Sequence, residues 1–158
     1  MNTIRIQGVL VDVDGVGVLI RGPAGFGKSL TALTLMDRGH RLVSDDLLEV
    51  VEGCGEAPVG RALEDEVRIE VRGLGIFKAK SLFPEGTVPS FPINLVVELD
   101  LFDTDRDTGR TFPEFESTSI LGKEVVQIRV PVARGMDPAL LVELVVKRFR
   151  LRSAREGP

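Results

Sequence analysis

The sequence predicts a single α/β domain over residues 1–158, with a mixed β-sheet around a phosphate-binding loop and few helices. First, an apolar run, a glycine-rich turn and a helical segment follow one another in residues 16–38. Second, the strand before that turn belongs to a meander, which departs from the simplest doubly wound nucleotide fold. Third, a long helical period returns near the end of the chain. The length of 158 residues suits one domain with a sizeable core.

The N-terminal segment is expected to form two short strands and then a hairpin. Residues 4–6 and 9–13 have the period-two character of strands. Asp14 and Gly15 form a turn of the kind that joins antiparallel neighbours, and the strand of residues 16–20 follows. The sheet is therefore expected to contain antiparallel as well as parallel pairs.

Residues 22–29 match the pattern G-x-x-x-x-G-K-[ST] and lie between a strand and a helix, as this pattern requires. Glycines let successive backbone N–H groups point at one anion, and the helix adds the positive end of its dipole. Lys28 can reach the β- and γ-phosphates, and the Ser29 hydroxyl can bind Mg²⁺. The predicted nucleotide-binding residues are Gly22, Pro23, Ala24, Gly25, Phe26, Gly27, Lys28 and Ser29. The alternative is a glycine-rich turn that binds nothing.

An acidic pair follows the first helix and the next strand. The helix of residues 30–38 is expected to end at Gly39, a residue type common after helix C-termini, and a strand covers residues 41–44. Asp45 and Asp46 come next. After a phosphate loop, carboxylates in this position are candidates for a metal ligand and a catalytic base. The alternative is a turn with two solvated carboxylates.

The middle of the chain contains a strand with a charged face. Residues 47–51 are expected to form a strand, and residues 52–65 are rich in glycine, proline and acidic residues, which favours an irregular loop. Residues 67–72 alternate apolar and charged side chains, as in a strand with one polar face. From spacing alone this face is either the solvated side of a sheet or part of a site. Its charged residues are Arg68, Glu70 and Arg72.

Residues 76–83 are expected to form a short helix or turn, and residues 84–92 a proline-punctuated connector. Residues 93–99 form a near-continuous apolar run, which predicts a strand buried on both faces. Glu98 and Asp100 lie at its end and are competing candidates for metal ligands.

Residues 102–117 are polar and broken by glycine and proline, and they are expected to form a mobile loop. Arg106 and Arg110 lie within it. A cation on a mobile loop can close over a transferring phosphate, although a solvated arginine is the commoner case. Strands are expected at residues 119–121 and 125–132.

The last element is expected to be a helix over residues 138–151, with Asp137 as its N-cap and Pro138 in its first turn. Its apolar stripe contains Leu141, Val145 and Phe149, with Leu140 and Leu144 beside it. The cations at its end suit the helix dipole, and the alternative is that they dock a partner protein. These cations are Lys147, Arg148, Arg150, Arg152 and Arg155.

Composition excludes several classes of protein. A net charge of −4 and the lack of Trp and Tyr argue against binding of nucleic acid. No apolar run approaches a membrane span, and residues 1–6 do not begin a signal peptide. Cys54 is the single cysteine, so an internal disulfide is impossible and a reducing compartment fits. A cytoplasmic location is therefore expected, with no membrane partner.

Several separated blocks of the chain resemble the HPr kinase/phosphorylases, bacterial enzymes that phosphorylate a serine of the small phosphocarrier protein HPr. The resemblance covers nearly the whole chain and implies the fold of that family's C-terminal catalytic domain. The N-terminal regulatory domain that many members carry is expected to be absent. The matching blocks are residues 8–13 (GVLVDV), 22–29, 38–46 (RGHRLVSDD), 69–76 (IEVRGLGI), 120–122 and 128–152.

The resemblance implies roles for the matching residues. Asp46 aligns with the carboxylate that accepts the serine hydroxyl proton, and Glu70 aligns with a metal ligand beside Ser29. Asp45 is a further candidate metal ligand. Arg72 lies in a block that serves both directions of the reaction, and Arg110 falls near a catalytic arginine. The implied cofactors are ATP and Mg²⁺.

Two positions depart from the family pattern. Gln7 stands where the family has a catalytic histidine, and glutamine cannot change its charge near neutral pH. The segment of residues 131–136 lacks arginines at Ala133 and Met136, and the corresponding family segment serves phosphorolysis. Attack of one anion on another needs cationic help. We therefore expect phosphorylase activity to be weak or absent.

The resulting hypothesis is an ATP-dependent protein-serine kinase of the HPr kinase type, acting on HPr or a related phosphocarrier. One alternative is a nucleotide-binding sensor or interaction module that has lost catalysis. Another is a kinase with a different acceptor, because acceptor choice lies in surface loops. The resemblance also implies a homohexamer.

Overall fold

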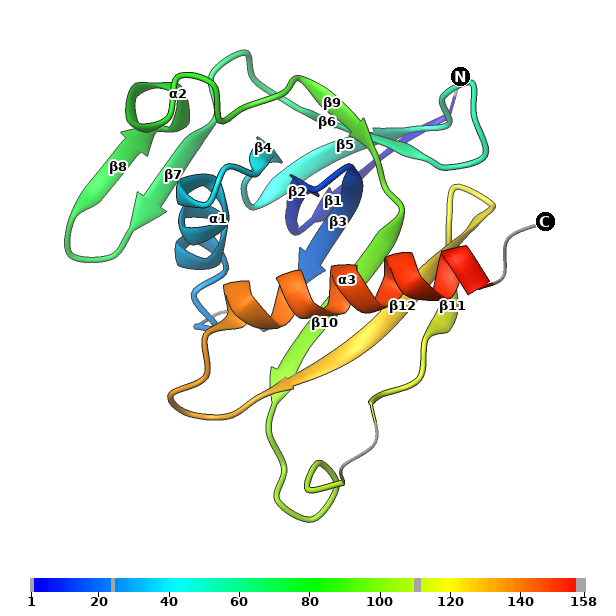
Figure 1. The fold of residues 1–158 in the computed structure, drawn as a ribbon. Helices are drawn as coiled ribbons and strands as arrows, with labels where there is room; N and C mark the ends of the chain where they lie inside the picture. The colour runs from blue at the N-terminus through cyan, green and yellow to red at the C-terminus, as the bar shows by residue number, and fades with distance from the viewer. Residues whose placement is uncertain (1, 24, 110–111, 156–158) are drawn as a thin grey trace.

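A six-stranded mixed sheet lies between two helices on one face and a four-stranded sheet on the other (Figure 1). This computed structural model describes residues 2–23, 25–109 and 112–155, with side chains up to residue 152. The layered α/β arrangement with few helices confirms the predicted fold class. None of the helices in these ranges is both long and apolar enough to cross a bilayer.

The six-stranded sheet has the order β11-β12-β10-β3-β2-β4. Its strands are β2 (Val9–Val13), β3 (Val16–Arg21), β4 (Arg41–Ser44), β10 (Leu95–Leu101), β11 (Glu116–Ile120) and β12 (Lys123–Val132). Strands β3, β10 and β12 are parallel neighbours, so their C-terminal ends meet at one edge of the sheet (Figure 1). The other pairs are antiparallel, and β2 with β3 forms the predicted hairpin. The prediction of a meander was wrong for its first strand, because residues 3–7 pair with residues 47–51 in the other sheet.

The central strands are buried on both faces, which explains their continuous apolar sequence. Val9 and Val11 of β2 pack toward the helices, whereas Leu10, between them, packs toward the four-stranded sheet. The turn between β2 and β3 contains Asp14 and Gly15, both with positive φ (51° and 86°), as the hairpin prediction requires.

Two helices cover one face, α1 (Lys28–Asp37) and α3 (Pro138–Arg155). Gly39 follows α1 with a φ of 95°, and its N–H donates to the Met36 carbonyl at 3.0 Å. The His40 N–H donates to the Leu35 carbonyl at 3.0 Å, which completes a Schellman motif and confirms the predicted C-terminal glycine. Asp137 accepts from the Ala139 N–H at 3.0 Å, as an N-cap does.

The buried stripe of α3 differs from the predicted one. Val145 is buried as expected, but Leu141 and Phe149 are only partly buried, and Leu140 and Leu144 are about half exposed. The helix rests instead on Ala139, Val142, Val145 and Val146. The apolar residues of this helix are too numerous for one face, so spacing alone did not select the buried stripe.

The four-stranded sheet contains two strands that the sequence did not predict. Its order is β1-β5-β6-β9, with β1 (Thr3–Gln7), β5 (Leu47–Val51), β6 (Val59–Ala62) and β9 (Ser90–Pro92). The prediction of a loop over residues 52–65 was therefore wrong at β6, and that of a connector over residues 84–92 was wrong at β9. Gly60 lies where a side chain would collide with Leu10 and Leu48, so close packing explains a glycine inside a strand.

A two-stranded hairpin completes the fold. It consists of β7 (Arg68–Val71) and β8 (Gly75–Lys78), and α2 (Ala79–Leu82) follows. The expectation of a helix or turn over residues 76–83 was wrong for its first half, because residues 76–78 pair with β7. Gly73 and Gly75 both have positive φ (89° and 109°) and allow the tight reversal.

The buried strand and the following loop lie close to the predicted ranges. Strand β10 begins two residues later than predicted, and Ile93 is buried without belonging to a strand. The loop after β10 ends at residue 115, because residues 116 and 117 belong to β11.

Candidate active site

The phosphate loop leaves the sheet where β3 and β10 end side by side. Gly22 follows β3 directly, and a Cβ on it would lie 2.8 Å from the Leu99 carbonyl oxygen of β10. Gly25 and Gly27 have φ values of 95° and 68°, which glycine adopts without strain. Phe26 packs against the core and holds the loop to the body of the domain. Ala24 lies outside the described residues.

The N-terminus of α1 is open to an anion. Gly27 is its N-cap, and within the described part of the chain no side chain accepts from the first-turn N–H groups. The Lys28 ammonium donates to the Gly22 carbonyl at 2.7 Å and to the Pro23 carbonyl at 3.2 Å, so it lies over the loop. Uncapped N–H groups and a nearby cation form an arrangement that suits phosphate.

The acidic pair lies directly beside this helix terminus. The Ser29 hydroxyl donates to the Asp45 carboxylate at 3.0 Å and 3.2 Å. Burial raises the pKa of Asp45 above its usual value, and the Asp46 charge adds to that effect, while the Ser29 hydrogen bond and Lys28 oppose it. The Asp46 backbone has a φ of 73°, and its carbonyl accepts from the Gly8 N–H at 2.7 Å. Asp46 is therefore held in an uncommon backbone conformation beside the phosphate loop.

The charged face of the β7–β8 hairpin forms the opposite wall of a cleft of about 750 Å³. Ile69 and Val71 point into the core, so the alternate residues face outward. The cleft brings together Lys28 and Ser29 with the acidic pair and the hairpin charges. These acidic and hairpin residues are Asp45, Asp46, Arg68, Glu70 and Arg72.

The donor set fits a magnesium ion that is shared with phosphate. The described residues contain no group of three or more His, Cys, Asp or Glu side chains placed to hold a metal by themselves. Mg²⁺ usually takes one or two protein carboxylates and fills its other positions with water and phosphate oxygens. The Ser29 hydroxyl beside the Asp45 carboxylate supplies oxygen ligands of the right kind, and Glu70 lines the same cleft.

A second cavity, of about 370 Å³, opens on the other side of Lys28. Gln7 lines it at the end of β1, where it pairs with Leu47, the residue after Asp46. Arg21 and Glu98 also line it, and their side chains form an ion pair at 3.5 Å. Lys28 and Asp46 border both cavities, so this pair lies at their junction.

The structure therefore brings most of the candidate residues together. The two other candidate metal ligands instead contact arginines. Glu98 pairs with Arg21 in the second cavity, and Asp100 accepts a hydrogen bond from Arg129 at 2.7 Å. This hydrogen bond, with the neighbouring charges, lowers the pKa of Asp100 below its usual value. Arg110 lies outside the described residues.

Sequence reasoning did not identify two arginines that lie near the site. Arg21 immediately precedes the phosphate loop, and this position is the signal that points to it. Arg129 of β12 fixes the start of the 102–109 loop, because its guanidinium contacts Asp107 at 2.9 Å as well as Asp100. Sequence gave no signal for that contact, because 22 residues separate the two partners.

A family model described as "HPr Serine kinase C-terminal domain" matches residues 1–156. A protein of *Geobacillus kaustophilus* named HPr kinase/phosphorylase is 45% identical over 152 residues, which are 95% of this chain and 49% of that protein. A protein of the same name from *Bacillus subtilis* is 42% identical over the same shares. The chain thus spans about half the length of these relatives.

A solved structure titled as the HPr(Ser) kinase/phosphatase from *Coxiella burnetii* has a TM-score of 0.88 and 28% sequence identity to this chain. The match covers 97% of this chain and 94% of that one. The similarity therefore extends through both sheets and the helices. This chain belongs to the HPr serine kinase C-terminal domain family.

Proposed function

We propose that this chain carries the chemistry of an ATP-dependent protein-serine kinase of the HPr kinase type, with HPr or a related phosphocarrier as acceptor. The observation that carries the proposal is the junction at Lys28 and Asp46, which border the phosphate-loop cleft and the second cavity. A nucleotide phosphate and an acceptor hydroxyl can approach this pair from different sides. The names of the family relatives support the choice of acceptor.

The residues divide the work of phosphoryl transfer between them. The backbone N–H groups at the start of α1 and Lys28 bind the β- and γ-phosphates and offset their charge. Ser29, Asp45 and Glu70 would hold Mg²⁺, which when bound neutralises charge on those phosphates. Arg72, from the hairpin, and Arg110 are proposed to add positive charge around the transferring group.

Asp46 is proposed to act as the general base. Its carboxylate takes the proton of the acceptor hydroxyl, whose oxygen bonds to the γ-phosphorus. The bond from the γ-phosphorus to the bridging oxygen breaks, and its electron pair leaves with ADP. Asp46, the proposed base, and Lys28, which binds the phosphates, both border the two cavities.

Phosphorolysis, in which inorganic phosphate attacks the seryl-phosphate and releases pyrophosphate and the serine hydroxyl, is proposed to be weak. Gln7 lines the second cavity and cannot gain a proton near neutral pH, so it adds no positive charge to that of Arg21 and Lys28 when a second anion is present. The turn of residues 133–136, which follows β12 at the same edge, has Ala133 and Met136 where arginines would assist. Forward transfer needs only positioned nucleotide and a base.

The test is transfer of labelled phosphate from ATP to a panel of phosphocarriers, with nucleotide binding followed in parallel. Asp46→Asn is expected to retain nucleotide binding and to lose transfer by at least about a hundredfold. Asp65→Asn, at an exposed position that lines neither cavity, is the matched control. Full transfer by Asp46→Asn would remove the proposed base. Binding without transfer to any acceptor would favour the sensor module, which Gln7 motivates.

A homohexamer is part of the same proposal. The exposed apolar side chains of α3 support association, because Leu140, Leu144 and Leu151 are 48%, 50% and 58% exposed. Sedimentation equilibrium of the purified chain measures the assembly directly. Replacement of Leu140 and Leu144 by serine is expected to shift it toward monomer, and an unchanged hexamer would remove this face as the contact.

A further inference from the structure

The second cavity contains an arginine that the proposed mechanism does not use. Arg21 is the last residue of β3, and Glu98 of β10 lies directly opposite it in the parallel pair. The Arg21 Nε and a Glu98 carboxylate oxygen are 3.5 Å apart. Within the described part of the chain, the two terminal nitrogens of Arg21 donate no hydrogen bond. The four N–H donors on these nitrogens are therefore available to a ligand.

The position of Arg21 associates it with the acceptor side. The larger cleft contains the uncapped start of α1 and the Ser29–Asp45 contact, so it is the side for the nucleotide and its metal. Arg21 lines the smaller cavity, together with Gln7 and Glu98, and Lys28 and Asp46 separate the two spaces. A phosphoryl group that moves from one space toward the other passes from Lys28 toward Arg21.

We propose that Arg21 binds the phosphoryl group after it has reached the acceptor, so that the second cavity is a site for a seryl-phosphate product or for inorganic phosphate. This inference rests on the proposed kinase function for its direction of transfer. Arginine suits the role because its planar fork of donors matches phosphate oxygens. Glu98 contacts Nε, so the terminal nitrogens of an arginine that lines this cavity are available to phosphate oxygens.

The charge balance of the cavity supports this assignment. Before transfer, the cations Arg21 and Lys28 are matched by the carboxylates Asp46 and Glu98. Two cations that line one cavity give an incoming phosphoryl anion an attractive interaction with each of them.

The competing explanation is that Arg21 and Glu98 form only a cross-strand ion pair that stabilises the sheet. The two explanations predict different signs. If the pair is only structural, removing either charge breaks the same contact. Both variants should then shift phosphate affinity in the same direction. If Arg21 binds phosphate, removing Arg21 weakens phosphate binding, whereas removing the neighbouring negative charge of Glu98 strengthens it.

The experiment titrates inorganic phosphate into the protein saturated with Mg-ADP, which fills the phosphate loop and leaves the acceptor side open. We expect Arg21→Gln to weaken phosphate binding about tenfold, the effect of losing a charge-assisted hydrogen bond. Arg21→Lys is expected to restore part of the loss, and Glu98→Gln to tighten binding by about twofold to fivefold. Melting temperatures report whether each variant is folded.

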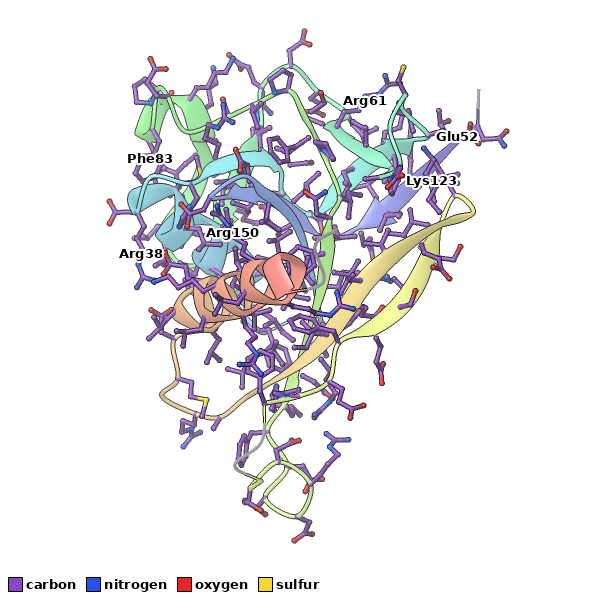
Figure 2. All side chains as sticks on the ribbon, turned by 45° about the vertical axis from the view of Figure 1, so that its right-hand side comes forward. Arg38, Glu52, Arg61, Phe83, Lys123 and Arg150 are labelled. Carbon is purple, nitrogen blue, oxygen red and sulfur yellow. The ribbon has the colours of Figure 1, made fainter. Side chains whose placement is uncertain are left out.

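Arg61→Gln is the matched control. Arg61 is 49% exposed and pairs with Glu49 across neighbouring strands, as Arg21 pairs with Glu98, but it lies on the four-stranded sheet (Figure 2). It is expected to leave phosphate affinity unchanged. An unchanged affinity in folded Arg21→Gln, or changes of the same sign in Arg21→Gln and Glu98→Gln, would overturn the proposal.

The outcome separates this inference from the kinase proposal. If the wild-type protein transfers phosphate to a phosphocarrier while its binding of inorganic phosphate does not depend on Arg21, the inference about Arg21 fails and the kinase proposal stands. If phosphate binding depends on Arg21 but no phosphocarrier is phosphorylated, the kinase proposal fails and the anion site itself is supported. Absence of phosphate binding by the wild-type protein with Mg-ADP removes the site.

Discussion

Two adjacent aspartates have different environments, and this difference is the basis for giving them different roles. Asp45 is partly buried, accepts from the Ser29 hydroxyl and has a raised pKa. Asp46 is exposed at the junction of the two cavities, with its backbone held at a φ of 73°. When two neighbouring carboxylates have different environments, they can take different roles. Here the environments suit Asp45 to a structural or metal-binding role and Asp46 to accepting a proton.

Asp45→Asn is expected to stabilise the protein in the absence of nucleotide. A folded-state pKa above 3.8 means that the ionised form of Asp45 is disfavoured by folding. Its contribution to stability is therefore fully present below the unfolded pKa and is lost as pH rises through the folded pKa. At pH 7 asparagine avoids this loss, so the melting temperature should rise, while magnesium-dependent nucleotide binding falls.

Melting curves from pH 3 to pH 7 test this expectation. The advantage of Asp45→Asn should disappear near pH 3, where the wild-type carboxyl is protonated. Asp65→Asn, at an exposed position, is the control for a general effect of lost charge. An Asp45→Asn variant that is less stable than wild type at pH 7 would show that the ionised Asp45 is favoured by its surroundings.

The Asp107–Arg129 pair gives a second prediction, for the base of the 102–109 loop. Hydrogen bonds from Arg129 lower the pKa of Asp107 to about 2. The stability that this pair contributes is thus present above the unfolded pKa near 3.8 and is lost as pH falls toward about 2. A carboxyl NMR titration should give Asp107 a pKa near 2, and Arg129→Gln should return it toward 3.8.

Hydrogen exchange near neutral pH provides an independent measurement of the same pair. Arg129→Gln is expected to speed exchange of the Asp103 and Asp107 N–H groups, which donate within the turn of residues 103–107. Exchange in β6 serves as the internal reference. Unchanged exchange at these two groups would mean that the turn holds its shape without Arg129.

Among the elements, those with a local signal were predictable and those defined by their partners were not. The phosphate loop, the Asp14–Gly15 turn and the end of α1 each depend on a few consecutive residues. Strands β6 and β9 are short and contain glycine or proline, and they exist because they extend the sheet that β5 begins. Their hydrogen-bond partners are distant in sequence, so composition alone indicated loops.

The end of α1 gives a third prediction. Gly39 has a φ of 95°, and the strand after it leads to Asp45. Gly39→Ala places a Cβ in an unfavourable conformation and should cost about 1 kcal/mol, with a fall in melting temperature of about 2–4 °C. Gly55→Ala is the matched control, because that glycine has open space around it and no positive φ. Equal melting temperatures for the two variants would contradict the prediction.

At the scale of the whole molecule, the site lies where the parallel strands have their C-terminal ends. Strands β3, β10 and β12 run the same way, so the phosphate loop, the 102–109 loop and the 133–136 turn leave the sheet at one edge. The sequence motifs predicted the phosphate loop and the acidic pair, and the family resemblance added roles for Glu70 and Arg72 of the hairpin. The sequence did not predict the second cavity, because Gln7, Arg21 and Glu98 come from three strands whose order only the fold defines.

This arrangement predicts where a nucleotide will change the dynamics of the protein. A saturating Mg-ATP analogue at about one hundred times its dissociation constant should stabilise the folded state by about 2.7 kcal/mol. Hydrogen exchange should slow most at the start of α1, around Asp45 and in the β7–β8 hairpin, which line the cleft. The four-stranded sheet beyond β5 should change only through global unfolding, because it lies behind the six-stranded sheet (Figure 1).

Lys28→Ala provides the control, since it removes the cation over the phosphate loop and should abolish both the added stability and the local protection. Protection that is centred on β6 and β9 instead of the cleft would place the nucleotide elsewhere. Protection at the cleft that persists in Lys28→Ala would show that the backbone N–H groups suffice for binding, and that the role of Lys28 is confined to the transfer step.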